Sequence, residues 1–157
     1  MLEKLLLAVD DSAQSRKAVP AAAELARAGG GIVYVLHVRE LHYPVPTVTG
    51  DRPEDAQRLV DDVVGELEGA GVKAEGAVRP STGGSPAAAI LEHARELGAT
   101  MIVVGSHGHS TLGGLLLGSV AHKLTQLSAC PVLVVRDEES LRERHHDVLR
   151  AQTRFQA

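Results

Sequence analysis

The sequence predicts an α/β domain of the doubly wound class, with a five-stranded parallel sheet in the order 3-2-1-4-5 and helices on both faces. Two observations support this prediction. Five short apolar segments alternate with four segments of helical periodicity, in units of about 30 residues, which is typical of parallel sheets. The first segment, Leu5 to Val9, is apolar throughout, as expected of a central strand covered on both faces.

A helix should follow this first strand. Ser12 is a candidate N-cap, and the glycines at 29–31 would end the helix. Pro20 lies inside this segment and has no backbone amide, so we expect a bend or a lost hydrogen bond near Arg16.

The next strand and helix are separated by a long loop. Ile32 to Val38 is rich in β-branched residues and predicts the second strand. Residues 40–52 contain two prolines and a glycine without periodicity, which indicates a loop longer than usual. The helix after it would end at Gly69 or Gly71, and its apolar face consists of Ala56, Leu59, Val60, Val63, Val64 and Leu67.

The third strand is predicted at an edge of the sheet. Apolar and charged residues alternate from Val72 to Val78, which indicates a strand less buried than the first two. Arg79 to Gly84 should form a turn. Ser85 followed by Pro86 is a typical helix start, and Gly98 would end that helix.

The last part of the domain repeats the strand, loop and helix pattern. Met101 to Val104 reads as a buried strand, and the glycine-rich segment 105–118 leads to a helix from Ser119. Val132 to Val135 would form the fifth strand. The charged residues 137–157 would make a tail that is either helical or disordered.

Composition argues against several classes of partner. The net charge is −4 and only three residues are aromatic, so the chain lacks the basic field and the stacking surfaces typical of nucleic-acid binding. It offers no basic patch for a membrane surface, and no apolar run is long enough for a signal peptide or a membrane span. Cys130 is the only cysteine, so no intramolecular disulfide is possible. We therefore expect a cytoplasmic protein that binds neither nucleic acid nor membrane.

Polar residues that could bind a ligand follow the first and fourth strands. In a sheet of this order the strand order reverses between these two strands, and ligands bind there, outside the carboxyl ends. Asp10 could accept hydrogen bonds from a base or a sugar hydroxyl. Glycines at 105–118 would let the backbone approach phosphates, and the helix start at Ser119 favours an anion. The simpler interpretations are that Asp10 is a turn or helix-cap residue and that the glycine-rich segment is an ordinary connecting loop. Because the two segments are expected to meet at one place, a nucleotide pocket is favoured.

These segments resemble the ATP-binding type of the universal stress protein family. The resemblance extends over residues 1–136 and is carried by Leu7-Ala8-Val9-Asp10-Asp11-Ser12, Gly105-x2-Gly108-x9-Gly118-Ser119 and Cys130-Pro131-Val132-Leu133-Val134-Val135. It implies ATP bound between the first and fourth strands, with any magnesium arriving with the triphosphate. It also implies a homodimer and a role in stress adaptation, with weak or absent ATP hydrolysis in many members.

The resemblance further implies which residues form the pocket. Asp10 and the Val38 backbone would lie at the adenosine end, and the glycines near ribose and phosphates. The full expected set is Ala8, Val9, Asp10, Val38, Val104, Gly105, Ser106, Gly108, Gly118, Ser119 and Val120. Family members often carry a basic residue around positions 113 and 114, where this chain has two glycines, and this departure would weaken the grip on phosphate or loosen the loop.

Two phosphate-handling classes fit less well. Gly113-x4-Gly118 followed by Ser119 approaches a P-loop, but the lysine that contacts the β- and γ-phosphates is missing. A receiver domain would explain Asp10-Asp11 as an acidic metal pocket. It would also need a phosphate-accepting aspartate after the third strand, where the chain has Val78-Arg79-Pro80.

Metal and acid–base sites are not favoured either. His107, His109 and His122 lack carboxylate or cysteine partners at ligand spacing, which argues against zinc. Asp10 and Asp11 form the candidate carboxylate pair, but the side chains of neighbouring residues in a turn usually point apart. No catalytic residue is therefore predicted.

The last strand suggests how the chain assembles. Val132 to Val135 is apolar on both faces and would lie at a sheet edge without a charge until Arg136. A twin strand across a two-fold axis would cover this edge, consistent with the implied homodimer. The tail folding back over the edge is the alternative.

Taken together, the expected protein is one nucleotide-binding domain over residues 1–136 with the tail 137–157. Its expected function is ATP-dependent signalling in a stress response. A nucleotide-independent, dimeric interaction module and a slow magnesium-dependent ATPase remain as alternatives.

Overall fold

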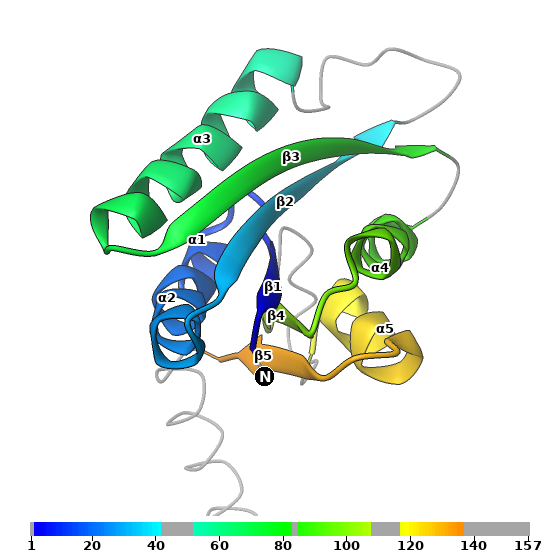
Figure 1. The fold of residues 1–157 in the computed structure, drawn as a ribbon. Coiled ribbons are helices and arrows are strands. Elements are labelled where there is room, and N and C mark those ends of the chain that lie inside the picture. The colour runs from blue at the N-terminus through cyan, green and yellow to red at the C-terminus, as the bar shows by residue number, and fades with distance from the viewer. Residues whose placement is uncertain (1, 42–51, 83–84, 108–116, 137–157) are drawn as a thin grey trace, which may run out of the picture.

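The computed structural model describes residues 2–41, 52–82, 85–107 and 117–136 (Figure 1). Strands and helices alternate along the chain, as the apolar periodicity predicts. In order, they are β1 (Lys4–Ala8), α1 (Ala13–Arg16), α2 (Ala18–Gly29), β2 (Ile32–Leu41), α3 (Pro53–Gly69), β3 (Lys73–Thr82), α4 (Pro86–Leu97), β4 (Met101–Gly105), α5 (Ser119–Leu127) and β5 (Val132–Val135).

The strands form one sheet in the order β3-β2-β1-β4-β5, and every neighbouring pair is parallel. β1 lies at the centre, where Leu7 is opposite Val35 of β2 and Val103 of β4. The predicted fold class and strand order are therefore confirmed.

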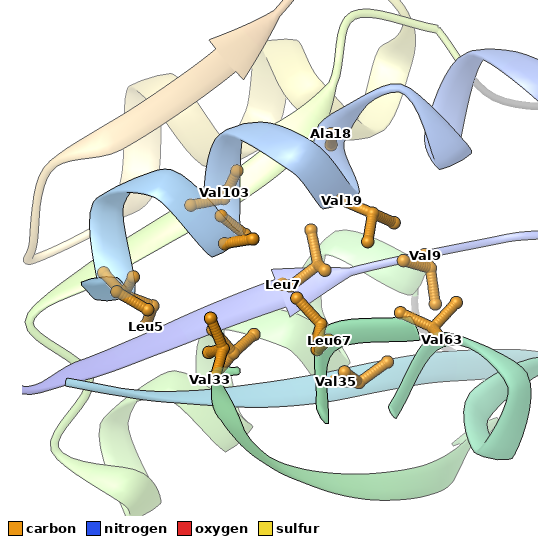
Figure 2. Packing of buried hydrophobic residues seen from close by; sticks show 14 of the residues in the cluster. Leu5, Leu7, Val9, Ala18, Val19, Val33, Val35, Val63, Leu67 and Val103 are labelled. Carbon is orange, nitrogen blue, oxygen red and sulfur yellow. The ribbon is translucent and has the colours of Figure 1, made fainter. Parts of the chain in front are cut away.

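Helices cover both faces and divide the core into two layers (Figure 1). In the first, here called the α2/α3 layer, Leu5 and Leu7 of β1 pack with side chains from α2, α3 and β2 (Figure 2). In the second, the α4/α5 layer, Leu6 and Ala8 pack with Ile90 of α4 and other residues. Because successive strand residues point to opposite faces, the apolar run of β1 contributes to both layers.

The helix predicted after the first strand is divided at Lys17. α1 ends at Arg16, and α2 begins one residue after the break. Pro20 has no amide to donate to the Arg16 carbonyl, so the interruption falls where the sequence predicts a bend.

β2 and β3 are longer than predicted. β2 continues past Val38 to Leu41, and β3 continues to Thr82 through most of the segment 79–84 that was expected to be a turn. The two strands remain in register as far as Leu41 opposite Thr82. Pro80 is tolerated because β3 is an edge strand, which confirms its predicted place in the sheet.

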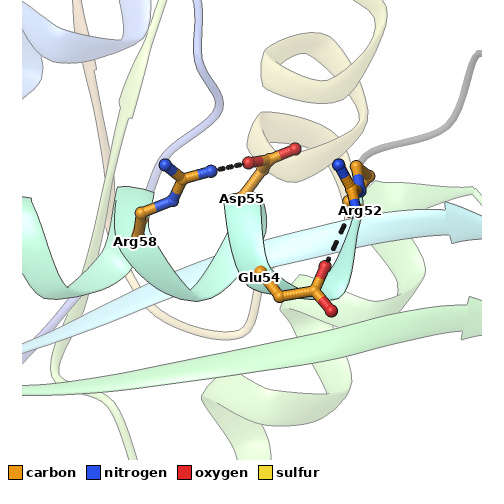
Figure 3. A network of polar contacts seen from close by, with 4 residues as sticks. All are labelled: Arg52, Glu54, Asp55 and Arg58. Carbon is orange, nitrogen blue, oxygen red and sulfur yellow. Dashed lines mark hydrogen bonds and ion pairs between the residues drawn. The ribbon is translucent and has the colours of Figure 1, made fainter.

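The first turn of α3 is acidic, which suits the positive end of a helix dipole. Glu54 lies 3.9 Å from Nε of Arg52, and Asp55 pairs with Arg58 (Figure 3). These side chains are largely exposed, so each pair contributes about 0–1 kcal/mol at most. Packing of its apolar face therefore holds α3 on the sheet.

Charged and titratable groups connect α4 to the long end of β3. Arg79 Nη2 lies 3.1 Å from Glu96 Oε2. His93, one turn before Glu96, has a buried Nδ1 without a hydrogen-bond partner among the described residues. Burial and, secondarily, the Arg79 charge lower the pKa of His93. The neutral imidazole is thus favoured between α4 and β3.

Candidate functional site

The carboxyl ends of β1 and β4 are neighbours at the centre of the sheet. Ala8 of β1 lies opposite Val104 of β4, and this pair is the last in their ladder. Asp10 and Ser106 each follow two residues later in the sequence. The two polar segments singled out in the sequence therefore share one end of the sheet, at the predicted reversal of strand order.

Asp10 is held by hydrogen bonds at its backbone and at one carboxylate oxygen. Its amide donates to Oγ of Ser15 at 2.8 Å. Its Oδ1 accepts from the Ser12 amide at 2.9 Å and from the Ser12 hydroxyl. Asp10 thus stabilises the turn before α1, which is the simpler of the two roles that the sequence suggests for it. No described residue donates to its other carboxylate oxygen, Oδ2. That oxygen could accept a hydrogen bond from a ligand.

Val9, directly before Asp10, is fixed by β2. Its amide donates to the Leu36 carbonyl at 2.9 Å, and its carbonyl lies 2.8 Å from Nδ1 of His37. A carbonyl can only accept, so Nδ1 of His37 carries the proton. His37 is buried, and sequence reasoning did not identify it. The available signal was a histidine inside the otherwise hydrophobic run 32–38.

Gly105 is required by packing against α1. A Cβ built at Gly105 would lie 2.9 Å from the Gln14 carbonyl oxygen and 3.1 Å from Cα of Ser15. Real Cβ atoms almost never approach backbone so closely, so the glycine lets α1 rest directly on the end of β4. This contact accounts for the glycine without a ligand, and a place for Gly105 beside ribose or phosphate stays a prediction.

The start of α5 is attached to the end of β4. Gly118 is buried, and its amide donates to the Ser106 carbonyl at 2.7 Å. The Ser106 amide donates in turn to the Val135 carbonyl at 2.8 Å. Ser119 and Val120 are the first two residues of α5, and neither amide donates to another group in the described part of the chain. Such free amides at the positive end of a helix favour an anion.

Three of the remaining predicted residues give the site an apolar side. Ala8 and Val104 are buried in the α4/α5 layer, and Val38 of β2 packs against the same layer while half-buried. A purine base is flat and largely apolar, so such a surface could support one.

Several predicted features lie outside the described residues. They are Gly108, the glycines at 113 and 114, residues 42–51 of the predicted loop, and the tail 137–157. Over the ranges that are described, no group of three or more His, Cys, Asp and Glu side chains is arranged to hold a metal ion. None of the described helices is both long enough and apolar enough to span a bilayer.

The fold and this site define a doubly wound α/β protein whose candidate ligand-binding groups lie where the strand order reverses. The chain belongs to the universal stress protein family, because the sequence model of that family matches residues 1–136. Its similarity to the universal stress protein YxiE of Bacillus subtilis is 41% identity over 151 residues, covering 87% of this chain and 100% of YxiE.

Solved structures share this fold. The MJ0577 protein of Methanocaldococcus jannaschii superposes with a TM-score of 0.73 and 26% identity, covering 87% of this chain and 97% of that protein. A universal stress protein from Archaeoglobus fulgidus in complex with dAMP superposes with a TM-score of 0.64 and 27% identity, covering 85% of this chain and 98% of that protein. Another universal stress protein, in complex with cAMP, superposes with a TM-score of 0.66 and 26% identity, covering 86% of this chain and 97% of that protein.

Proposed function

We propose that this chain binds an adenine nucleotide at the carboxyl ends of β1 and β4, with ATP as its natural ligand. The observation that carries the proposal is the placement of two complementary groups at one strand end. Among the described residues, none donates to Asp10 Oδ2, and none accepts from the amides of Ser119 and Val120 in the first turn of α5. Family relatives of the same fold in complex with dAMP and cAMP support the choice of an adenine nucleotide.

In this proposal each part of the site has a separate role. Asp10 Oδ2 and the Val38 backbone bind the adenosine end, with Ala8, Val9 and Val104 beneath it. The amides of Ser119 and Val120 bind phosphate oxygens, and the glycine loop with Ser106 encloses them. Magnesium would accompany the triphosphate and neutralise part of its charge.

The proposed consequence of binding is a change of surface rather than rapid chemistry. The sequence identifies no general base and no nucleophile, so we propose weak ATP hydrolysis at most. Nucleotide occupancy would then change which partner the protein contacts during stress. Phosphate release by the protein with ATP and magnesium tests the alternative of a slow ATPase, because sustained turnover above the buffer rate would support it.

Asp10→Ala is expected to weaken binding of AMP and ATP by about 10- to 100-fold, because one charged hydrogen-bond acceptor is lost from the site. Isothermal titration calorimetry measures both affinities. Asp61→Ala is the matched control, since Asp61 is an exposed carboxylate of α3 that bonds only Gln57 among its described neighbours. Its affinities should equal those of the wild type.

Two results would contradict the proposal. If the wild-type protein binds no adenine nucleotide at millimolar concentration, the alternative of a nucleotide-independent interaction module is favoured. If Asp10→Ala binds as tightly as Asp61→Ala, the nucleotide pocket lies elsewhere.

We also propose that two copies of the chain associate through β5. Each residue from Val132 to Val135 is half-exposed although all are apolar, and within the described chain β5 pairs with β4 alone. Such an apolar edge is stabilised when a second strand covers it.

The dimer is expected to have twice the mass of one chain in sedimentation equilibrium at micromolar concentration. Dilution should produce monomers, and amide hydrogen exchange should accelerate at Val132–Val135 as it does so. A monomer at every concentration, or exchange at β5 that does not depend on concentration, would argue against this interface.

A further inference from the structure

We infer that Ser15 is a positioning residue for Asp10, an inference that rests on the proposed function. Ser15 lies on α1 and need not touch the nucleotide. Its hydroxyl instead fixes the backbone of the residue whose carboxylate would bind it. The inference concerns three residues, Asp10, Ser12 and Ser15, whose hydrogen bonds form a closed ring.

Each member of this ring donates to the next. The Asp10 amide donates to Ser15 Oγ at 2.8 Å, and the Ser15 amide donates to Ser12 Oγ at 3.1 Å. The Ser12 hydroxyl then donates to Asp10 Oδ1, and the Ser12 amide donates to the same oxygen at 2.9 Å. One carboxylate oxygen thus has two donors, which fixes the direction of the other oxygen, Oδ2.

The position of Ser15 is set by the sheet. Ser15 is only 4% exposed, and its Cα would lie 3.1 Å from a Cβ at Gly105. α1 therefore rests on the end of β4, whose ladder with β1 ends at Ala8, two residues before Asp10. The ring holds the carboxylate relative to both central strands before any ligand arrives. Such preorganisation raises affinity because less freedom is lost on binding.

The test is a double-mutant cycle on AMP affinity, which reports mainly on the adenosine end of the site. Ser15→Ala alone is expected to weaken AMP binding by about 5-fold, since the Asp10 amide loses its acceptor. In the Asp10→Ala background the same change should alter affinity by less than about 2-fold, because nothing remains to be positioned. A residue with a purely structural role would cause the same loss in both backgrounds.

Thr100→Val is the matched control at the opposite end of the sheet. It removes only a hydroxyl, which accepts from the Lys4 amide at 3.1 Å and donates to the Lys4 carbonyl at 3.0 Å. We expect it to lower the midpoint of urea unfolding as Ser15→Ala does, and to leave AMP affinity unchanged. Ser12→Ala changes the half-exposed serine of the ring and should show the same dependence on Asp10 even if Ser15→Ala fails to fold.

The outcomes separate the inference from the function on which it rests. Wild-type protein that binds no AMP or ATP would overturn the proposed function. Wild-type binding together with serine variants that lose nothing, or lose equally in both backgrounds, would overturn the positioning role alone. A loss of AMP affinity that occurs when Asp10 is present, and not in the Asp10→Ala background, confirms the positioning role.

Discussion

Gly105→Val is expected to lower the free energy of unfolding by about 3 kcal/mol and to weaken adenine nucleotide binding by more than about 30-fold. A single Cβ at this position would already lie 2.9 Å from the Gln14 carbonyl oxygen. Valine adds two methyl groups to that Cβ, and the atoms it meets belong to the α1 backbone. They can move only if α1 moves as a unit, and Asp10 would then lose its hydrogen bonds with both Ser15 and the N-cap residue Ser12.

Urea unfolding and AMP titration measure the two effects separately. Gly65→Ala is the control, because nothing lies within 4 Å of a Cβ built at Gly65, inside α3. That change should raise the free energy of unfolding by about 0.5–1 kcal/mol through the higher helix propensity of alanine, without altering affinity. A Gly105→Val protein that keeps both its stability and its AMP affinity would show that α1 does not rest on β4 in solution.

The fold could be predicted because its signals are local and agree with one another. The run Leu5 to Val9 has the composition of a central strand, and β1 is the central strand. Pro86 begins α4, and Gly98 ends it with φ 65°, a left-handed conformation that favours glycine. Where local signals conflict, prediction was wrong. Arg79 to Gly84 was predicted to be a turn, whereas pairing with β2 extends β3 through Pro80 to Thr82.

The place of the site could also be predicted, but the way it is built could not. Strand order alone brings Asp10 and Ser106 to one end of the sheet. The roles of Ser15, His37 and Gly105 depend on contacts between segments distant in the sequence, such as the 2.8 Å separation of His37 Nδ1 from the Val9 carbonyl. In the sequence, a glycine beside a polar loop indicates a phosphate site in either of two cases. It can face a ligand, or it can pack against a helix backbone, as Gly105 does.

Leu7→Ala is expected to lower the free energy of unfolding by about 3–4 kcal/mol, the largest change in stability predicted for a single truncation here. Leu7 is fully buried at the centre of β1, in the α2/α3 layer with Val35 and Val103 (Figure 2). The neighbouring strands hold the backbone on both sides, so the layer cannot close around the missing atoms and a cavity adds to the lost burial. Leu127→Ala removes the same atoms from a side chain that is 67% exposed and should cost less than about 0.5 kcal/mol.

The same variant separates stability from binding. Leu7 faces the α2/α3 layer, which it shares with Val9, whereas the other apolar residues of the proposed pocket, Ala8, Val38 and Val104, belong to the α4/α5 layer. The folded fraction of Leu7→Ala should therefore bind AMP with nearly wild-type affinity at a temperature well below its unfolding midpoint. A large loss of affinity in protein that is still folded would show that the sheet transmits the change from one layer to the other. A loss of stability no larger than that of Leu127→Ala would contradict the central position of β1.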